Sequence, residues 1–145
     1  MPRATLSYSG VDRRGVVRIL IVEDEVRLRV NLVRVLSRRA FTMEQAATVA
    51  EAKKLLDERT YDAVLLDWQL PDGTGLDVCR AIRASKNGDV HVIMFTGRAD
   101  HSDRLRAFDA GVDDYVVKDV EIEEIGARLK AVARRGRGSP TTVPI

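Results

Sequence analysis

Residues 61–67, Tyr-Asp-Ala-Val-Leu-Leu-Asp, decide how this chain folds. A short apolar run of this kind is typical of a strand buried on both faces of a parallel sheet. Two more apolar runs, at 17–22 and 91–95, have the same character, and longer stretches with helical spacing separate the three. Since parallel strands need helical crossovers, we expect residues 61–66 to form a central strand of a parallel α/β sheet.

Strand and helix patterns alternate five times along the chain. The expected strands are at 17–22, 41–45, 61–66, 91–95 and 114–117, and the expected helices are at 26–39, 48–58, 76–84, 100–110 and 120–135. Val26, Val30, Val33 and Leu36 are spaced to share one inward face of the first helix, and 70–75 is expected to be a loop. The order predicts an α/β fold with a doubly wound five-stranded parallel sheet.

Length and composition indicate one domain. The 145 residues, 45% hydrophobic and 32% charged, are typical of a globular chain. We assign 1–16 to an N-terminal extension, 17–135 to the domain, and 136–145 to a tail or truncated linker. The net charge of +2 does not argue for direct nucleic-acid contact, no apolar run is long enough for a membrane, and one cysteine excludes an internal disulfide. A cytoplasmic protein is expected.

Polar residues follow four of the expected strands. Glu23 and Asp24 come after the first, Asp67 after the third, Thr96 after the fourth and Lys118 after the fifth. Ligands of doubly wound sheets bind outside the carboxyl ends of the strands. We therefore expect these five side chains to meet at one edge of the sheet.

These residue types indicate phosphoryl transfer. Crowded carboxylates favour a hard divalent cation, and Mg²⁺ takes oxygen ligands. The expected Mg²⁺ ligands are Glu23, Asp24, Asp67 and the backbone carbonyl of Gln69. Asp67 is also the candidate nucleophile, which would form an aspartyl phosphate, while the threonine hydroxyl and the lysine ammonium would bind the transferred phosphoryl oxygens.

Each residue alone has a simpler explanation. Acidic residues after strands are often helix N-caps, and a single lysine is usually solvated. The coincidence at four strand ends favours a site. A small enzyme fits less well, because an Asp-nucleophile phosphatase would need a second Asp where Gln69 stands. A nucleotide site would need a glycine-rich turn where residues 23–25 are acidic.

Four segments together resemble the receiver domain of bacterial two-component response regulators. They are ILIVEDE at 19–25, AVLLDWQLPDGTGL at 63–76, VIMFTG at 92–97 and AGVDDYVVK at 110–118. The resemblance covers about residues 17–135 and depends on the four motifs in order. It implies the flavodoxin-like (βα)5 receiver fold.

The resemblance also implies a signalling function. Asp67 would accept a phosphoryl group from a phosphohistidine of a sensor histidine kinase, and Glu23 and Asp24 fall at the family's acidic pair for Mg²⁺. Such a domain assists its own phosphorylation and dephosphorylation but is not an enzyme in the sense of turnover.

The family's switch positions are present, with one departure. Thr96 and Lys118 fall at its hydroxyl and lysine positions, and Tyr115 falls at its aromatic switch position. The family usually has a cis proline after the lysine, but this chain has Asp119. Since a cis bond before a residue other than proline costs about 2.5–4 kcal/mol, we expect a trans bond. The departure leaves open a degenerate receiver that acts as a phosphorylation-independent binding module.

The last part of the domain resembles the receivers of winged-helix transcription factors, whose active forms dimerise through the fourth helix, fifth strand and fifth helix. The resemblance implies four ion pairs across a two-fold axis: Arg104 with Glu124, Asp109 with Lys130, Asp113 with Arg128, and Asp114 with Arg135. Exposed pairs contribute only about 0–1 kcal/mol each, so a solvated charged face is the alternative. Either a DNA-binding effector domain follows residue 145 or the protein is a stand-alone receiver.

Overall fold

The structure is a computed structural model that describes residues 16–136, with side chains through Val132. The predicted extension at 1–16 and tail at 136–145 therefore lie almost entirely outside the described residues. Within the described part, no helix has both the length and the apolar character that a membrane span requires.

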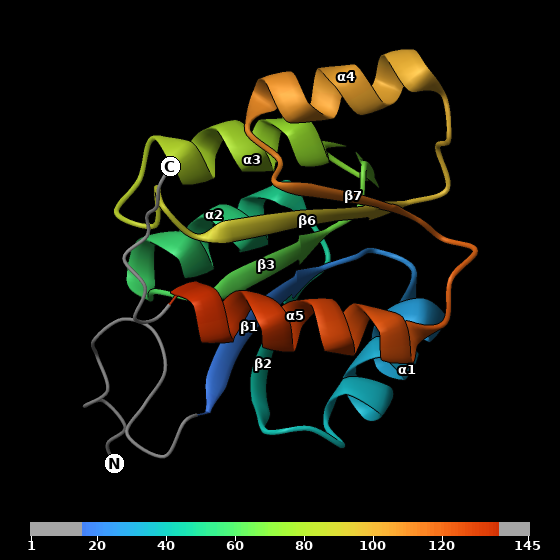
Figure 1. Cartoon of the computed structure of the whole chain (residues 1–145). Coiled ribbons are helices and arrows are strands. Elements are labelled where there is room, and N and C mark those ends of the chain that lie inside the picture. The colour runs from blue at the N-terminus through green and yellow to red at the C-terminus, as the bar shows by residue number, and fades with distance from the viewer. Residues whose placement is uncertain (1–15, 137–145) are drawn as a thin grey trace.

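A parallel five-stranded sheet forms the centre of the domain (Figure 1). Its strands, in spatial order, are β2 (Phe41–Ala46), β1 (Val17–Val22), β3 (Ala63–Leu66), β6 (His91–Thr96) and β7 (Asp114–Val117). The helices are α1 (Val26–Leu36), α2 (Val49–Glu58), α3 (Gly75–Arg83), α4 (His101–Ala110) and α5 (Ile122–Gly136). The order, with β3 in the middle, confirms the predicted doubly wound α/β fold.

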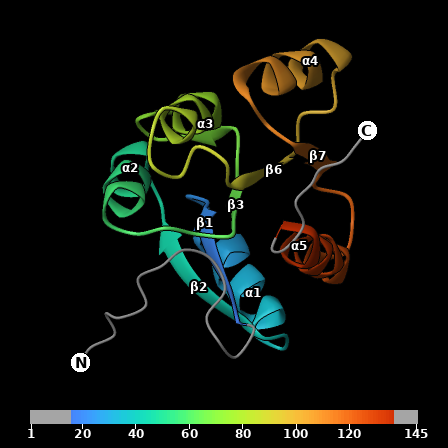
Figure 2. The ribbon, with the colours of Figure 1, turned by 60° about the vertical axis from the view of Figure 1, so that its left-hand side comes forward.

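Helices cover both faces of the sheet (Figures 1 and 2). Alternate residues of β1 and β3 point to opposite sides, as the two-residue period of a strand requires. Leu20 and Leu66 belong to the core under α2, α3 and α4, whereas Ile19 and Leu65 belong to the core under α1 and α5. The burial of both faces explains why these strands are apolar throughout.

Two details differ from the sequence prediction. Helix α1 ends at Leu36, and it buries Leu32 and Val35, whereas Val26 and Val30 are exposed by 59% and 56%. The predicted inward face was therefore right for Leu36, which is buried, and for Val33, which packs partly buried against the core. It was wrong for Val26 and Val30, because the core lies against a neighbouring stripe of apolar residues. The predicted loop at 70–75 instead contains a short antiparallel hairpin, β4 (Gln69–Leu70) and β5 (Gly73–Thr74).

Helix ends are fixed by side chains close to the sheet's carboxyl edge. Thr48 caps α2, accepting a hydrogen bond from the backbone N–H of Glu51 at 3.0 Å. Asp72, in the hairpin after β3, accepts bonds from the N–H groups of Val49 and Ala50 at 2.7 and 3.0 Å. These bonds fasten the segment after Asp67 to the start of α2, because a helix N-terminus has free N–H donors.

Gly75, the first residue of α3, allows a close approach to the end of β3. Its N–H donates to the carbonyl of Trp68 at 2.6 Å. A Cβ atom at this position would lie 2.1 Å from the carbonyl oxygen of Asp67 and 3.2 Å from Cγ of Leu66. No residue other than glycine therefore fits here unless the backbone that carries Asp67 moves.

We predict that Gly75→Ala lowers the free energy of unfolding by about 2–3 kcal/mol, because the new methyl group overlaps backbone atoms. Gly97→Ala is the matched control, since a Cβ at Gly97 meets nothing within 4 Å. Its expected effect is within about 0.5 kcal/mol. Urea unfolding measures both variants, and equal stability of the two would contradict the close approach described for Gly75.

Candidate functional site

The five predicted site residues lie at the carboxyl ends of four neighbouring strands. Glu23 and Asp24 follow β1, Asp67 follows β3, Thr96 ends β6 and Lys118 follows β7. The backbone continues the sheet's hydrogen bonding at these positions: the N–H of Asp67 donates to Val22 at 3.0 Å, and that of Lys118 donates to Thr96 at 2.9 Å. The sheet itself therefore sets where these side chains begin.

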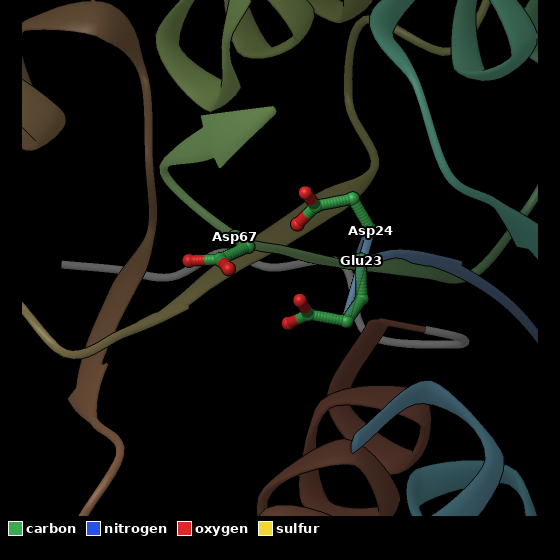
Figure 3. Close-up of side chains that lie close together, drawn as sticks. All are labelled: Glu23, Asp24 and Asp67. Atoms are coloured by element: carbon green, nitrogen blue, oxygen red, sulfur yellow. The ribbon is translucent and has the colours of Figure 1, made fainter. Parts of the chain in front are cut away.

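Three carboxyl groups gather beyond β1 and β3 (Figure 3). One oxygen from each of Glu23, Asp24 and Asp67 lies within 4.8 Å of the others. Glu23 and Asp67 are buried, with exposed fractions of 2% and 9%, whereas Asp24 is exposed. The cluster is thus open to solvent on the side of Asp24, where a small ion or ligand can enter.

Lys118 reaches into this cluster. Its Nζ lies 2.8 Å from Oδ2 of Asp67 and 3.1 Å from Oε1 of Glu23. The structure therefore brings the lysine to the carboxylates, although Asp119 follows it. The peptide bonds of the described residues include no cis bond, which confirms the predicted trans bond before Asp119.

Burial and charge shift the pKa of two groups in the site. Burial raises the pKa of Glu23 to about 6, a hydrogen bond from the Glu25 N–H opposes the rise, and the nearby charge of Asp67 adds to it. Burial lowers the pKa of Lys118, but its hydrogen bond to Asp67 and the charges of both carboxylates outweigh that effect and leave the pKa raised. The site therefore holds a firmly protonated lysine and a carboxyl group that readily takes up a proton.

Asp67 is held through both carboxylate oxygens. Its Oδ1 accepts a hydrogen bond from the N–H of Trp68 at 2.7 Å, and its Oδ2 is bound by Lys118. An aspartate that is fixed in this way keeps a defined direction, as an attacking nucleophile needs.

The donor set fits a hard divalent cation. Three carboxylates in one cluster supply oxygen ligands, and the exposed side near Asp24 leaves space for the waters that Mg²⁺ keeps. Receiver domains, the family that the sequence resembles, generally bind Mg²⁺. The backbone carbonyl of Gln69 stays a predicted ligand, because no described contact places it toward the cluster.

Thr96 and Tyr115 are linked through one loop residue. Thr96 is buried, and its hydroxyl oxygen accepts a hydrogen bond from the N–H of Arg98 at 3.3 Å. The hydroxyl of Tyr115 donates to the carbonyl of Arg98 at 2.8 Å. Tyr115 is on β7, and its ring centroid lies 6.3 Å from that of Phe108 on α4. A movement of the Thr96 side chain can thus displace Tyr115 through the backbone of Arg98, to which both are hydrogen-bonded.

Two residues beside the site were not singled out from the sequence. Trp68 follows Asp67 and is buried, and Arg98 lies over its ring with Cζ at 4.7 Å from the centroid. Arg98 also donates to Oε1 of Gln69 at 3.3 Å. The available signal was their position, one residue after Asp67 and two after Thr96, but sequence alone does not show that they touch.

Most of the predicted dimer residues lie on α4, β7, α5 and the turn before β7. Within one chain, Arg128 binds Asp114 at 2.9 Å and Glu124 at 3.1 Å. Asp113 binds Arg83 at 2.7 Å and accepts a hydrogen bond from the N–H of Val92. Asp113, Asp114, Glu124 and Arg128 therefore already have ion-pair partners within one chain. The side chain of Arg135 lies outside the described part.

Residues 19–130 match the response regulator receiver domain family. The phosphate regulon transcriptional regulatory protein PhoB of Escherichia coli is 40% identical over 119 residues, which cover 81% of this chain and 52% of PhoB. The transcriptional regulatory protein ResD of Bacillus subtilis is 37% identical over 125 residues, covering 86% of this chain and 51% of ResD. This chain therefore spans about half the length of the curated relatives it matches.

A solved structure of similar fold is the receiver domain of the sensor histidine kinase PA1611 from Pseudomonas aeruginosa, which has a magnesium ion in its active-site cleft. It is 30% identical, has a TM-score of 0.71, and the match covers 81% of this chain and 98% of that one. The family match spans most of the domain and includes all four strand ends that carry the site. This chain belongs to the response regulator receiver domain family.

Proposed function

We propose that this domain accepts a phosphoryl group on Asp67 from the phosphohistidine of a sensor histidine kinase, in a reaction that needs Mg²⁺. The contact of Lys118 Nζ with Asp67 Oδ2, at 2.8 Å inside a cluster of carboxylates, carries this proposal. It joins a nucleophile, a fixed positive charge and a set of oxygen ligands. The magnesium ion in the active-site cleft of the similar PA1611 receiver supports the Mg²⁺ part of this proposal.

The residues of this chain have separate tasks in the transfer. A carboxylate oxygen of Asp67 attacks phosphorus, the bond between phosphorus and the donor nitrogen breaks, and the histidine leaves with the electron pair. Lys118 and the hydroxyl of Thr96 bind phosphoryl oxygens and stabilise their charge. Glu23 and Asp24, with Asp67, would hold Mg²⁺, which would supply further neutralisation of that charge. The domain thereby assists its own phosphorylation without being a conventional enzyme.

The signal then passes to the surface formed by α4, β7 and α5. When Thr96 turns toward the phosphoryl group, its hydroxyl gives up the hydrogen bond from the N–H of Arg98. Arg98 also accepts a hydrogen bond from Tyr115 through its carbonyl, so the loop that carries Arg98 and the Tyr115 side chain move together. Movement of this loop shifts α4. Leu105 and Phe108 on α4 are exposed by 50% and 42%, so this surface offers apolar area to a second copy of the chain.

The expected output is control of transcription in the cytoplasm. The curated relatives PhoB and ResD are transcriptional regulatory proteins and are about twice as long as the matched region. In this proposal, a dimerised receiver brings together two DNA-binding effector domains that follow residue 145. The other candidate, a phosphorylation-independent binding module, has its only support in Asp119, and Lys118 reaches Asp67 despite that residue.

We predict that the wild-type domain gains one phosphoryl group when it is incubated with acetyl phosphate and Mg²⁺. Asp67→Asn should gain none, because it lacks the nucleophilic carboxylate, and omission of Mg²⁺ should slow the reaction by at least about tenfold. Asp57→Asn, at an exposed position of α2, is the matched control. Intact-mass spectrometry measures the adduct, and an adduct that survives Asp67→Asn would refute the assignment.

We predict that Mg²⁺ binds more weakly below about pH 6. A carboxyl group with a raised pKa is protonated below that value, so Mg²⁺ must displace a proton from Glu23, whose pKa is about 6. The dissociation constant should rise toward about tenfold per pH unit as the pH falls through this range. Fluorescence of Trp68, the single tryptophan, follows the titration.

Glu23→Gln is the matched variant for this titration. Its Mg²⁺ affinity should be lower at neutral pH but almost independent of pH between about 5.5 and 7.5, because the titrating group has been removed. If the wild type and Glu23→Gln lose affinity in parallel, the proton does not reside on Glu23.

We predict that phosphorylation shifts the domain from monomer to dimer and that Asp109 pairs with Lys130 across the two-fold axis. Asp109→Lys or Lys130→Asp alone should weaken the phosphorylated dimer about tenfold, because two like charges then face each other at both copies of the contact in the two-fold interface. The double variant restores opposite charges and should recover the affinity of the wild-type dimer. Analytical ultracentrifugation measures the dissociation constants. A double variant no better than either single variant would show that these residues do not meet.

A further inference from the structure

Trp68 lies under two guanidinium groups from different parts of the chain. Cζ of Arg98, in the loop after β6, is 4.7 Å from the ring centroid, and Cζ of Arg106, on α4, is 5.3 Å from it. Both distances are within the range of a cation–π interaction, for which tryptophan is the best aromatic partner. The Trp68 side chain therefore connects the segment after β3 to α4.

Polar contacts hold the two arginines in place over the ring. Asp103 accepts from Nη1 of Arg98 at 3.4 Å and from Nη1 of Arg106 at 3.3 Å. Nη2 of Arg98 also donates to Oε1 of Gln69 at 3.3 Å. The shared carboxylate of Asp103 is only 13% exposed, so it joins the two cations at the edge of the core.

The position of Trp68 matters because its backbone touches the reacting carboxylate. Its N–H donates to Oδ1 of Asp67 at 2.7 Å, while Lys118 binds the other oxygen. A displacement of Trp68 would turn the Asp67 carboxylate away from its present direction. Because a small misplacement of a nucleophile slows transfer strongly, the groups that fix Trp68 affect the reaction.

We propose that Arg98 and Arg106 form a cation–π clamp on Trp68, and that both are positioning residues that fix the Asp67 carboxylate for phosphoryl transfer and connect it to α4. The inference depends on the proposed phosphorylation of Asp67. Neither arginine is a catalytic residue, because each acts through the tryptophan. The clamp links α4 to Asp67 through the side chains of Arg98 and Arg106. Arg98 is also the residue that connects Thr96 with Tyr115, there through its backbone N–H and carbonyl groups.

Burial and solvent exposure distinguish the clamp from ordinary core packing. The Trp68 residue is only 2% exposed, but the side chains of Arg98 and Arg106 are 42% and 61% exposed. Long exposed side chains lose conformational freedom when they are ordered, so a surface arginine without a role is normally free. Here two of them converge on one ring beside the reacting group.

The test compares Arg98→Gln and Arg106→Gln with Arg80→Gln. Arg80 is a matched control, because its side chain is also 61% exposed and also forms an i,i+3 ion pair on a helix, with Asp77 at 3.7 Å. The rate of phosphorylation by acetyl phosphate is measured against donor concentration at saturating Mg²⁺. Acrylamide quenching of Trp68 fluorescence is measured on the same samples.

We expect each clamp variant to be phosphorylated about fivefold more slowly at every donor concentration, with Mg²⁺ affinity unchanged. Quenching of Trp68 should increase, because the ring is released toward solvent. Arg106→Lys should recover most of the rate, since a lysine also binds an aromatic face. Arg80→Gln should match the wild type in both measurements.

Wild-type rates and wild-type quenching in both clamp variants would overturn the inference, as would equal slowing by Arg80→Gln. If the wild type itself gains no phosphoryl group, the proposed function fails, and the positioning role fails with it. In that event increased quenching in the clamp variants alone would still show a clamp without a catalytic purpose, which also overturns the inference as stated.

Discussion

The contact between Lys118 and Asp67 is the interaction on which the rest of the site depends. Two carboxylates buried at the end of a sheet repel each other and lose hydration, and both effects appear as the raised pKa of Glu23. Lys118 offsets part of this cost by placing its ammonium between Asp67 and Glu23, at 2.8 and 3.1 Å. One positive charge does not balance the cluster when Asp24 is counted, so the site keeps an excess of negative charge. In the proposed function, that excess of negative charge attracts Mg²⁺, and the bound cation then allows Asp67 to accept a phosphoryl group.

The parallel sheet explains why so much could be predicted from sequence. Strands that run in one direction end on one edge, so the residues after each strand must meet, whatever their separation in the chain. Glu23, Asp67 and Lys118 follow this rule, and their side chains do meet. The rule does not say which side of a helix is buried when apolar residues occur on several sides. In α1 the helical spacing placed Val30 on the inward face, but Val30 is exposed, and packing against α5 and the sheet buries Leu32 instead.

Contacts between distant side chains were the other part that sequence could not supply. The Trp68 clamp joins residues that are separated along the chain and have no shared periodicity, because an arginine reaches its partner through a long flexible side chain. The same holds for Arg83, which binds Asp113 and the carbonyl of Gly111 and so ties the end of α3 to the turn before β7. An ion pair implied by family resemblance therefore competes with pairs inside one chain. In the proposed dimer, pairing through these charges would only exchange one ion-pair partner for another, so the apolar area on α4 would have to supply much of the net stabilisation.

Asp119 shows how far one departure from the family pattern extends. A proline in this position would fix the start of the last loop, yet the place of Lys118 is set earlier. Its N–H bonds to the carbonyl of Thr96 at 2.9 Å, which continues the pairing of β7 with β6. The side chain then needs only its own length to reach Asp67. The position of the Lys118 ammonium group beside the carboxylates is therefore set by the sheet and not by the loop. Asp119 affects mainly the path of the chain into α5, and it has little effect on the contact between Lys118 and Asp67.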